Sequence, residues 1–301
     1  MNNEFPTQQK YGAYLTRQLI ATDGQSVIYR AMHAITGQDV TLRLIMIQSK
    51  DVEASLRECF QILQETKFIT ARNISHVLDY GNQENILYIA TDYWPGGSLL
   101  KRMERRHFGQ NATEPPQLPA SQEVLQMVDQ VAEALDALHE QGIIHAQLSA
   151  SSILFDAMGN AAVGDVGMLL LLKALFNLET TNSFNITRYS APELWEGHRP
   201  TAATDLYAFA CIIYELLTGR PPFDNNSISK LMKAHTDELA QPPHYLRKEL
   251  PSDLAMVFWQ ALAKPVDRRY ASARKLYLDL ADALQKIPEE PTDFFTFSLD
   301  S

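Results

Sequence analysis

The sequence predicts an α+β fold of two lobes: a first lobe of antiparallel strands with one helix, and a second lobe that is mainly helical. A chain of 301 residues exceeds what one hydrophobic core usually serves. Hydrophobic residues make up 46% of the chain and charged residues 21%, which is typical of a globular protein. Strand-like segments come first, and long segments with helical spacing follow them.

The first lobe is expected over residues 14–93, after an N-terminal extension at 1–13. Its strands are indicated by β-branched and apolar residues beside turn residues, and its helix by apolar residues at helical spacing. The expected elements are strands at 27–31 and 40–45 around a turn at 36–39, a helix at 52–70, and strands at 76–80 and 86–93.

The second lobe is expected over residues 94–286, joined to the first by a hinge at 92–96. A loop rich in Asn, Gln, Pro and Gly is expected at 108–120, and an acidic, proline-containing, flexible tail at 287–301. The helices expected in this lobe are Glu123–Gln141, Asp205–Thr218, Leu254–Ala263 and Leu276–Gln285.

Composition and charge restrict the partners that we expect. The net charge of -10 disfavours binding to phosphate backbones, so nucleic acid is not an expected partner. The most apolar runs, 168–176 and 208–217, are too short to cross a membrane, so we expect no membrane insertion. Cys59 and Cys211 lie in apolar contexts and are expected to be small buried residues, which suits a cytoplasmic protein.

Several motifs in the second lobe occur in a fixed order. Ser-Ala-Pro-Glu at 190–193 is followed by Asp-Leu-Tyr-Ala-Phe-Ala at 205–210, and Gly-Asp-Val-Gly lies upstream at 164–167. Together with the segment from Gly142 to Leu154, these motifs closely resemble Hanks-type Ser/Thr protein kinases, bacterial and eukaryotic-like. The resemblance spans residues 14 to about 284 and implies the two-lobed protein kinase-like fold.

The resemblance places the family's catalytic loop at 145–152, where this chain departs from the family. Gln147 stands where the family has the Asp that accepts the substrate's proton, and Ser152 where it has a magnesium-binding Asn. An amide is no base at neutral pH, so the loss should cost a factor of about 10² to 10⁴ in rate. The family's two positive charges are replaced by Ala146 and Ser149, and His145 is expected to be a packed structural residue.

Arg43 stands where the family has the lysine that holds the ATP phosphates. It keeps the charge, but its planar fork is larger than an ammonium and is aimed differently. Thr41 replaces the alanine that normally contacts adenine. For the family's helix glutamate, an ungapped count gives Ile62, and Glu58 is favoured over Glu65 as the partner of Arg43.

The family's glycine-rich loop, which approaches the nucleotide phosphates closely, is also altered. The three glycine positions hold Ala21, Asp23 and Ser26, and the Asp23 carboxylate would repel phosphate. The resemblance still assigns Thr91 and Asp92, with Arg43 and Asp165, to weak nucleotide binding. ATP and Mg²⁺ binding are therefore expected to be weak or absent.

Other positions of the family pattern are retained. Asp165 matches the family's magnesium-chelating Asp and is the expected metal ligand. The resemblance implies that Asp205 holds the backbone of the catalytic loop by hydrogen bonds. It also implies that Glu193 pairs with an arginine near the end of the lobe, either Arg268 or Arg269. Scaffold residues thus remain where reactive ones have been lost.

The segment Leu169–Phe176 is unusually apolar for the position that the resemblance gives it, within the activation segment. We expect it to form a helix or an ordered turn, with Lys173 pointing to solvent, because so large an apolar run is costly to expose. Two roles stay open at this point: a helix packed against the vacant cleft and the first-lobe helix, or a groove for a partner.

The sequence favours a pseudokinase, a kinase-like signalling domain with impaired catalysis that acts as a protein-binding or allosteric module. Its protein partner is not identified by the sequence. One alternative is an atypical Ser/Thr kinase with residual phosphotransfer, because Asp165 and Arg43 are present. A purely structural domain is the third possibility.

Overall fold

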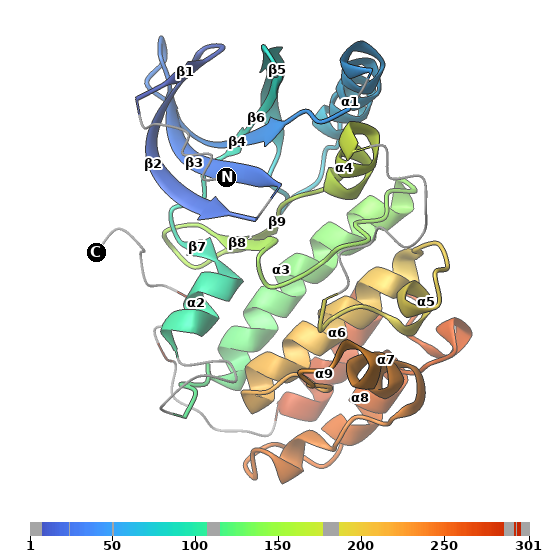
Figure 1. Ribbon diagram of the computed structural model, residues 1–301. Coiled ribbons are helices and arrows are strands. Elements are labelled where there is room, and N and C mark those ends of the chain that lie inside the picture. Colours follow the sequence, from blue (N-terminus) through green and yellow to red (C-terminus); the bar gives the residue numbers. More distant parts are fainter. Residues whose placement is uncertain are drawn as a thin grey trace. The chain divides into compact units, whose positions relative to one another are not determined.

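The computed structural model describes residues 8–23, 25–49, 51–106, 115–176, 187–285, 292 and 294–295 (Figure 1). Residues 1–7, most of the expected tail at 287–301 and residues 108–114 of the expected loop lie outside this part. Contacts divide the chain into two units. The first unit holds the described residues of Met1–Thr70, Ser75–Trp94 and Val166–Thr180, and the second holds those of Ala71–Ile74, Pro95–Asp165 and Thr181–Ser301.

The first unit is built on a six-stranded antiparallel sheet. Alternate residues of one strand, Val40, Leu42 and Leu44, are almost fully buried, which explains the strand pattern in the sequence. The register pairs Ala31 with Val40, so the predicted hairpin is confirmed. In the order β1-β2-β3-β4-β6-β5, the strands are β1 Lys10–Tyr11, β2 Tyr14–Thr22, β3 Ser26–His33, β4 Asp39–Met46, β6 Ile86–Asp92 and β5 Val77–Gln83.

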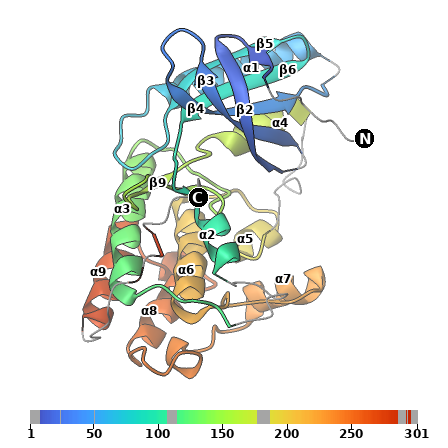
Figure 2. The ribbon, with the colours of Figure 1, turned by 90° about the vertical axis from the view of Figure 1, so that its left-hand side faces the viewer.

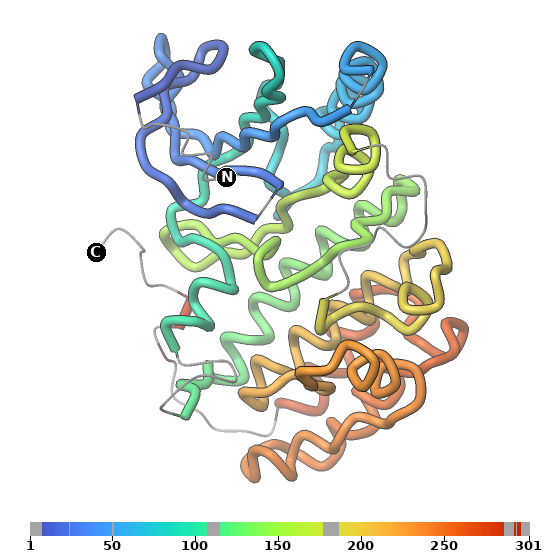
Figure 3. Tube along the Cα trace, viewed as in Figure 1, coloured from blue at the N-terminus to red at the C-terminus, as the bar shows by residue number. Residues whose placement is uncertain are grey.

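Two helices complete the first unit and lie side by side in Figures 1 and 3. Helix α1, Val52–Lys67, begins at Asp51, whose carboxylate accepts a hydrogen bond from the backbone N–H of Ala54 at 3.0 Å. Helix α4, Met168–Phe176, contains the apolar segment that the sequence predicted to be ordered. The two helices and the sheet share a core to which α4 contributes Leu171, Ala174 and Leu175, and α1 contributes Cys59 and Leu63.

The second unit is mainly helical (Figure 2). Its helix α6 is buried almost throughout, and α3 packs against both α6 and α9. A small antiparallel sheet of the order β7-β8-β9 accompanies the helices. In chain order, the helices and strands of the second unit are β7 Gly97–Ser98, α2 Leu99–Arg105, α3 Ser121–Glu140, β8 Ile153–Phe155, β9 Ala161–Val163, α5 Pro192–Trp195, α6 Ala202–Thr218, α7 Ile228–Asp237, α8 Leu254–Ala261 and α9 Ala273–Leu284.

The unit boundary, one side chain of α4 and the tail differ from the sequence-based expectation. The described residues 166–176 group with the first unit and 71–74 with the second, so one boundary near residue 93 does not describe the contacts. Lys173 is half-buried rather than exposed. The tail is not loose throughout, because Phe294 and Phe295 are 2% and 5% exposed. These apolar contacts outweigh the flexibility that an acidic, proline-containing composition suggests.

Both cysteines are free and fully buried, as the sequence predicted. Burial and the nearby charge of Glu58 raise the pKa of Cys59 to about 12, and burial raises the pKa of Cys211. Both shifts favour the protonated thiol, which is the less nucleophilic form. Of the helices in the described ranges, none has the length and apolar character that crossing a membrane requires.

Candidate functional site

The Asp205 carboxylate holds the backbone of the loop at 145–152 inside the second unit. Its oxygens accept hydrogen bonds from the backbone N–H groups of His145 at 2.9 Å and Ala146 at 2.7 Å. The Nε2 atom of His139 lies 2.9 Å from the same carboxylate. Ala146 adopts a left-handed backbone conformation with φ of 67°, which these hydrogen bonds help to maintain. Asp205 is 1% exposed and has a positioning role.

His145 links this loop to the turn that precedes Asp165. It is 2% exposed, and its Nε2 atom lies 2.9 Å from the carbonyl oxygen of Gly164. Because a carbonyl only accepts hydrogen bonds, Nε2 carries the proton. The N–H of Gly164 in turn donates to the carbonyl of Ser152 at 2.7 Å. The histidine is therefore buried and hydrogen-bonded to the turn before Asp165.

The Ser152 hydroxyl is engaged within its own turn. It donates to the carbonyl of Ser149 at 2.9 Å and accepts from the N–H of Ser149 at 3.0 Å. The residue is 2% exposed, so water does not compete for this hydroxyl. With one hydrogen bond donated and one accepted, this hydroxyl could offer a metal ion only a single remaining lone pair.

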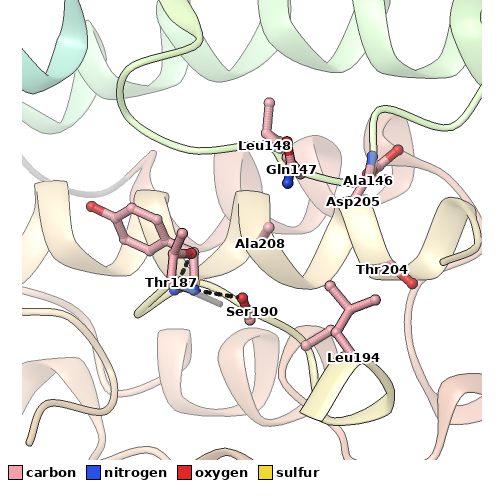
Figure 4. Close-up of a pocket in the computed structure, with 11 residues that line it drawn as sticks. Ala146, Gln147, Leu148, Thr187, Ser190, Leu194, Thr204, Asp205 and Ala208 are labelled. Atoms are coloured by element: carbon pink, nitrogen blue, oxygen red, sulfur yellow. Dashed lines mark hydrogen bonds between the residues drawn. The ribbon is translucent and has the colours of Figure 1, made fainter. Parts of the chain in front are cut away.

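Gln147 lines a small pocket together with residues of the turn at 187–190 (Figure 4). The opposite wall is a turn in which the N–H of Thr187 donates to the Ser190 hydroxyl at 2.9 Å. The pocket has a volume of about 20 Å³, enough for about one water molecule. The amide of Gln147 can donate and accept hydrogen bonds there but cannot take up a proton at neutral pH.

Asp165 lies in a tight turn just before α4 begins. It has a left-handed backbone with φ of 58°, and Gly167 has φ of 78°. A side chain at Gly167 would come within 3.0 Å of the Thr66 hydroxyl of α1, so glycine permits the close approach of this turn to α1. The turn thus depends on both of its unusual backbone conformations.

Glu193 and Arg269 form a buried ion pair in the second unit. Two parallel hydrogen bonds of 2.8 and 2.7 Å join the guanidinium to the carboxylate, and the Thr204 hydroxyl donates to Glu193 at 2.8 Å. Burial alone would raise the pKa of Glu193, but the hydrogen bonds and charge of Arg269 outweigh it and lower the pKa. Of the two arginines left open by the sequence, Arg269 forms the pair and Arg268 is exposed.

A third buried carboxylate, Glu215, was not singled out as a site residue from the sequence. The Tyr189 hydroxyl donates to it at 2.7 Å, and Arg188 forms an ion pair with it at 2.9 Å. Burial raises the pKa of Glu215 despite the charge of Arg188. These contacts fasten the turn at 187–190 to helix α6. The available signal was an acidic residue inside the apolar run at 208–217.

In the first unit, Arg43 is engaged by the residues that replace the glycines of the phosphate loop. Its Nη1 atom donates to the Asp23 carboxylate and to the Ser26 hydroxyl, each at 2.7 Å. Asp23 also accepts from the N–H of Ser26 at 2.6 Å and of Gln25 at 3.1 Å. Partial burial would raise the pKa of Asp23, but Arg43 and the Ser26 hydrogen bonds outweigh it and lower the pKa.

The other first-unit positions have separate surroundings. Glu58, the favoured partner of Arg43, is exposed on α1, and the carboxylate of the ion pair with Arg43 belongs to Asp23. Asp92 accepts from the N–H of His76 at 2.8 Å, and the His76 ring lies 3.1 Å from it. Thr91 pairs with Thr41 across β4 and β6.

The fold and the spacing of these residues match a known family. The family model of the protein kinase domain matches residues 15–281 of the chain. The chain belongs to the protein kinase family.

Within the described residues, no group of three or more His, Cys, Asp or Glu side chains is placed to hold a metal ion.

Curated protein kinases resemble this kinase domain over nearly its whole length. The Ser/Thr protein kinase PknD of Mycobacterium tuberculosis is 30% identical over 277 residues, which cover 91% of this chain and 40% of that protein. PrkC of Bacillus subtilis is 25% identical over 272 residues, which cover 90% of this chain and 40% of PrkC. The chain thus spans about two fifths of the length of these relatives.

Solved structures support the kinase fold. The kinase domain of Mycobacterium tuberculosis PknI, in a double mutant, superimposes with a TM-score of 0.71 at 21% identity. The match covers 93% of this chain and 98% of that structure. The expected α+β fold, with an antiparallel sheet and one helix followed by a helical part, is confirmed. From the sequence, α4 had been assigned to the helical second lobe, whereas its contacts place it in the first unit.

Proposed function

We propose that this kinase domain is a pseudokinase: catalytically impaired, with weak or no ATP binding, and acting as a protein-binding or allosteric module. One observation carries the proposal: the catalytic loop keeps its scaffold while its reactive positions have other side chains. Asp205 still holds the loop backbone, but Gln147 stands at the base position and the Ser152 hydroxyl is engaged by Ser149.

The donor set of the catalytic loop fits magnesium poorly. Mg²⁺ prefers carboxylate oxygens and near-ideal octahedral geometry. Of the two positions that hold the metal in the family, Asp165 keeps a carboxylate, but Ser152 offers a neutral and buried hydroxyl. We therefore assign no catalytic step to a bound metal.

The first unit gives separate support for weak nucleotide binding. Arg43, the counterpart of the phosphate-binding lysine, is paired with a carboxylate of its own chain. A nucleotide phosphate would have to compete with Asp23 for the guanidinium and would also meet the negative charge of that carboxylate.

Phosphotransfer should be absent. With radiolabelled ATP and either Mg²⁺ or Mn²⁺, the purified chain is expected to incorporate no more phosphate than a Gln147→Ala variant. A Gln147→Asp/Ser152→Asn variant restores the family's base and metal ligand and serves as the matched comparison. Metal-dependent incorporation by the unmodified chain that disappears in Asp165→Ala would instead establish an atypical Ser/Thr kinase.

Asp23→Asn should strengthen nucleotide binding. The asparagine can still accept the hydrogen bonds from Gln25 and Ser26, but it no longer neutralises Arg43. For the unmodified chain we expect a dissociation constant for Mg-ATP weaker than roughly 10 μM, and for Asp23→Asn a gain of about tenfold, or about 1.4 kcal/mol. Isothermal titration calorimetry measures both values.

The control for this variant is Asp23→Asn/Arg43→Gln, which should lose the gain because the released charge is gone. Equal affinity in the unmodified chain and in Asp23→Asn would show that the ion pair does not limit nucleotide binding.

A further inference from the structure

The C-terminal residues Thr292, Phe294 and Phe295 lie against a surface of the second unit that is remote in sequence. The carbonyl of Phe294 accepts a hydrogen bond of 2.9 Å from Nη1 of Arg102, which lies 192 residues earlier. The Thr292 hydroxyl donates to the carboxylate of Glu123, which lies 169 residues earlier. The segment has no helix or strand of its own among its described residues, so it is held as a short peptide would be.

Aromatic contacts bury this segment. The ring of Phe295 stacks on Phe155 with centroids 5.1 Å apart and an interplanar angle of 23°. Gly159, with φ of 86°, forms part of the same surface, and a side chain there would come within 2.7 Å of the Phe295 carbonyl oxygen. We call the surface formed by Arg102, Arg106, Glu123, Phe155 and Gly159 the aromatic slot.

Arg102 shows that the aromatic slot is suited to a peptide carbonyl. The side chain is 4% exposed and lies over the Phe155 ring at 4.6 Å. Its Nη1 atom donates to the Phe294 carbonyl, while Nε and Nη2 have no hydrogen-bond partner among the residues that the structure describes. Burial lowers the pKa of Arg102 to about 10. Loss of the Phe294 carbonyl would remove a hydrogen bond from a guanidinium that is already poorly satisfied, so an empty slot is unfavourable.

The charges of the slot and of the segment are complementary. Helix α2 carries Lys101, Arg102 and Arg105, and Arg106 follows it directly, in a chain whose net charge is -10. The sequence after Lys286 has no basic residue and contains Glu289, Glu290, Asp293 and Asp300. An acidic peptide with two adjacent phenylalanines therefore matches the slot in both charge and apolar character.

We propose that the aromatic slot is a peptide-binding site whose ligand is an acidic Phe-Phe segment. In the intact chain the occupant is the chain's own segment around Phe294 and Phe295. When this segment is weakened, the same segment from a second copy of the chain takes its place. The aromatic slot contains neither the catalytic-loop positions nor Arg43. The peptide-binding proposal is therefore tested independently of the proposed loss of catalysis.

The test uses the full chain with Phe294→Ala/Phe295→Ala, which frees the slot, and a fluorescent synthetic peptide of residues 288–299. Fluorescence anisotropy should show saturable binding to this variant. The unmodified chain should bind the peptide at least tenfold more weakly, because its own segment occupies the slot. Binding should weaken as salt is raised, since exposed charges contribute to it.

Two controls define the site. A peptide with the phenylalanines of positions 294 and 295 replaced by alanine should not bind, and Gly159→Val added to the double variant should abolish binding of the natural peptide. Hydrogen exchange of α3 shows whether each variant is folded. If α3 of the double variant exchanges as fast as an unfolded chain, two milder variants of the otherwise unmodified chain are used in its place. These are Phe295→Leu and Gly159→Ala, and each should raise the hydrogen exchange of residues 292–295.

Three results would overturn the proposal. The first is no peptide binding by a folded double variant. The second is equal affinity of the peptide for the variant and the unmodified chain. The third is unchanged exchange of residues 292–295 in both milder variants.

Discussion

Leu171→Asp is expected to destabilise the first unit by about 3 kcal/mol or more. Leu171 is 1% exposed and packs in the core that α4 shares with α1 and the sheet. The substitution removes apolar contacts and places a carboxylate among the apolar residues of this core. Urea unfolding followed by circular dichroism measures the loss, and hydrogen exchange locates it in α1 and α4.

Leu170→Asp is the matched control, because it makes the same chemical change one residue earlier, at a side chain that is 54% exposed. Its effect should stay within about 0.5 kcal/mol. The pair of variants separates the two roles left open by the sequence. An unchanged stability of Leu171→Asp, with fast exchange across 168–176, would favour a partner-binding groove over a packed helix.

Arg269→Ala should destabilise the second unit by about 3–5 kcal/mol, because it leaves the Glu193 carboxylate buried without its ionic partner. It also removes the hydrogen bonds that the guanidinium donates to the carbonyls of Ala203, Ala263 and Lys264. The neighbouring exposed residue provides the control, and Arg268→Ala should be nearly neutral. Equal effects of the two variants would contradict this assignment.

The pH dependence of this variant follows from the lowered pKa of Glu193. Because the folded-state pKa lies below the ordinary value of 4.5, the ion pair contributes stability above that pH and loses it as pH falls through the folded value. The difference in stability between the unmodified chain and Arg269→Ala should therefore be largest near neutral pH and narrow in acid. A difference that widens below pH 4 would contradict the linkage.

The sequence predicted the long and strongly patterned elements well. Helices α1, α3, α6, α8 and α9 and the hairpin of β3 and β4 all fall near their expected ranges. Each has either an apolar stripe or an alternating pattern with a buried face. Helix α7 was missed although Ile228, Leu231 and Met232 have helical spacing. His235 is its one buried residue, so this apolar stripe does not belong to the core. Helix α2 was too short for its spacing to be decisive.

The sequence identified which residues occupy the candidate site, but it did not give the contacts of their side chains. Gln147, Ser152 and Arg43 were identified by their positions in motifs, but a motif does not give the direction of a hydroxyl or a guanidinium. The pairing of Arg43 with Asp23 depends on the β3–β4 register and on the turn at 23–26. The buried Phe294 and Phe295 were overlooked because proline and acidic residues dominated the interpretation of the tail.

The two buried cysteines give each unit its own chemical reporter. Cys59 lies beneath α4 in the first unit, and Cys211 lies inside α6 in the second. Because each thiol is fully enclosed, a labelling reagent can modify it only after the structure around it opens. Mass spectrometry of the modified peptides would then give two labelling half-lives from one sample. The opening of the sheet unit and of the helical unit can thus be timed separately in the unmodified chain.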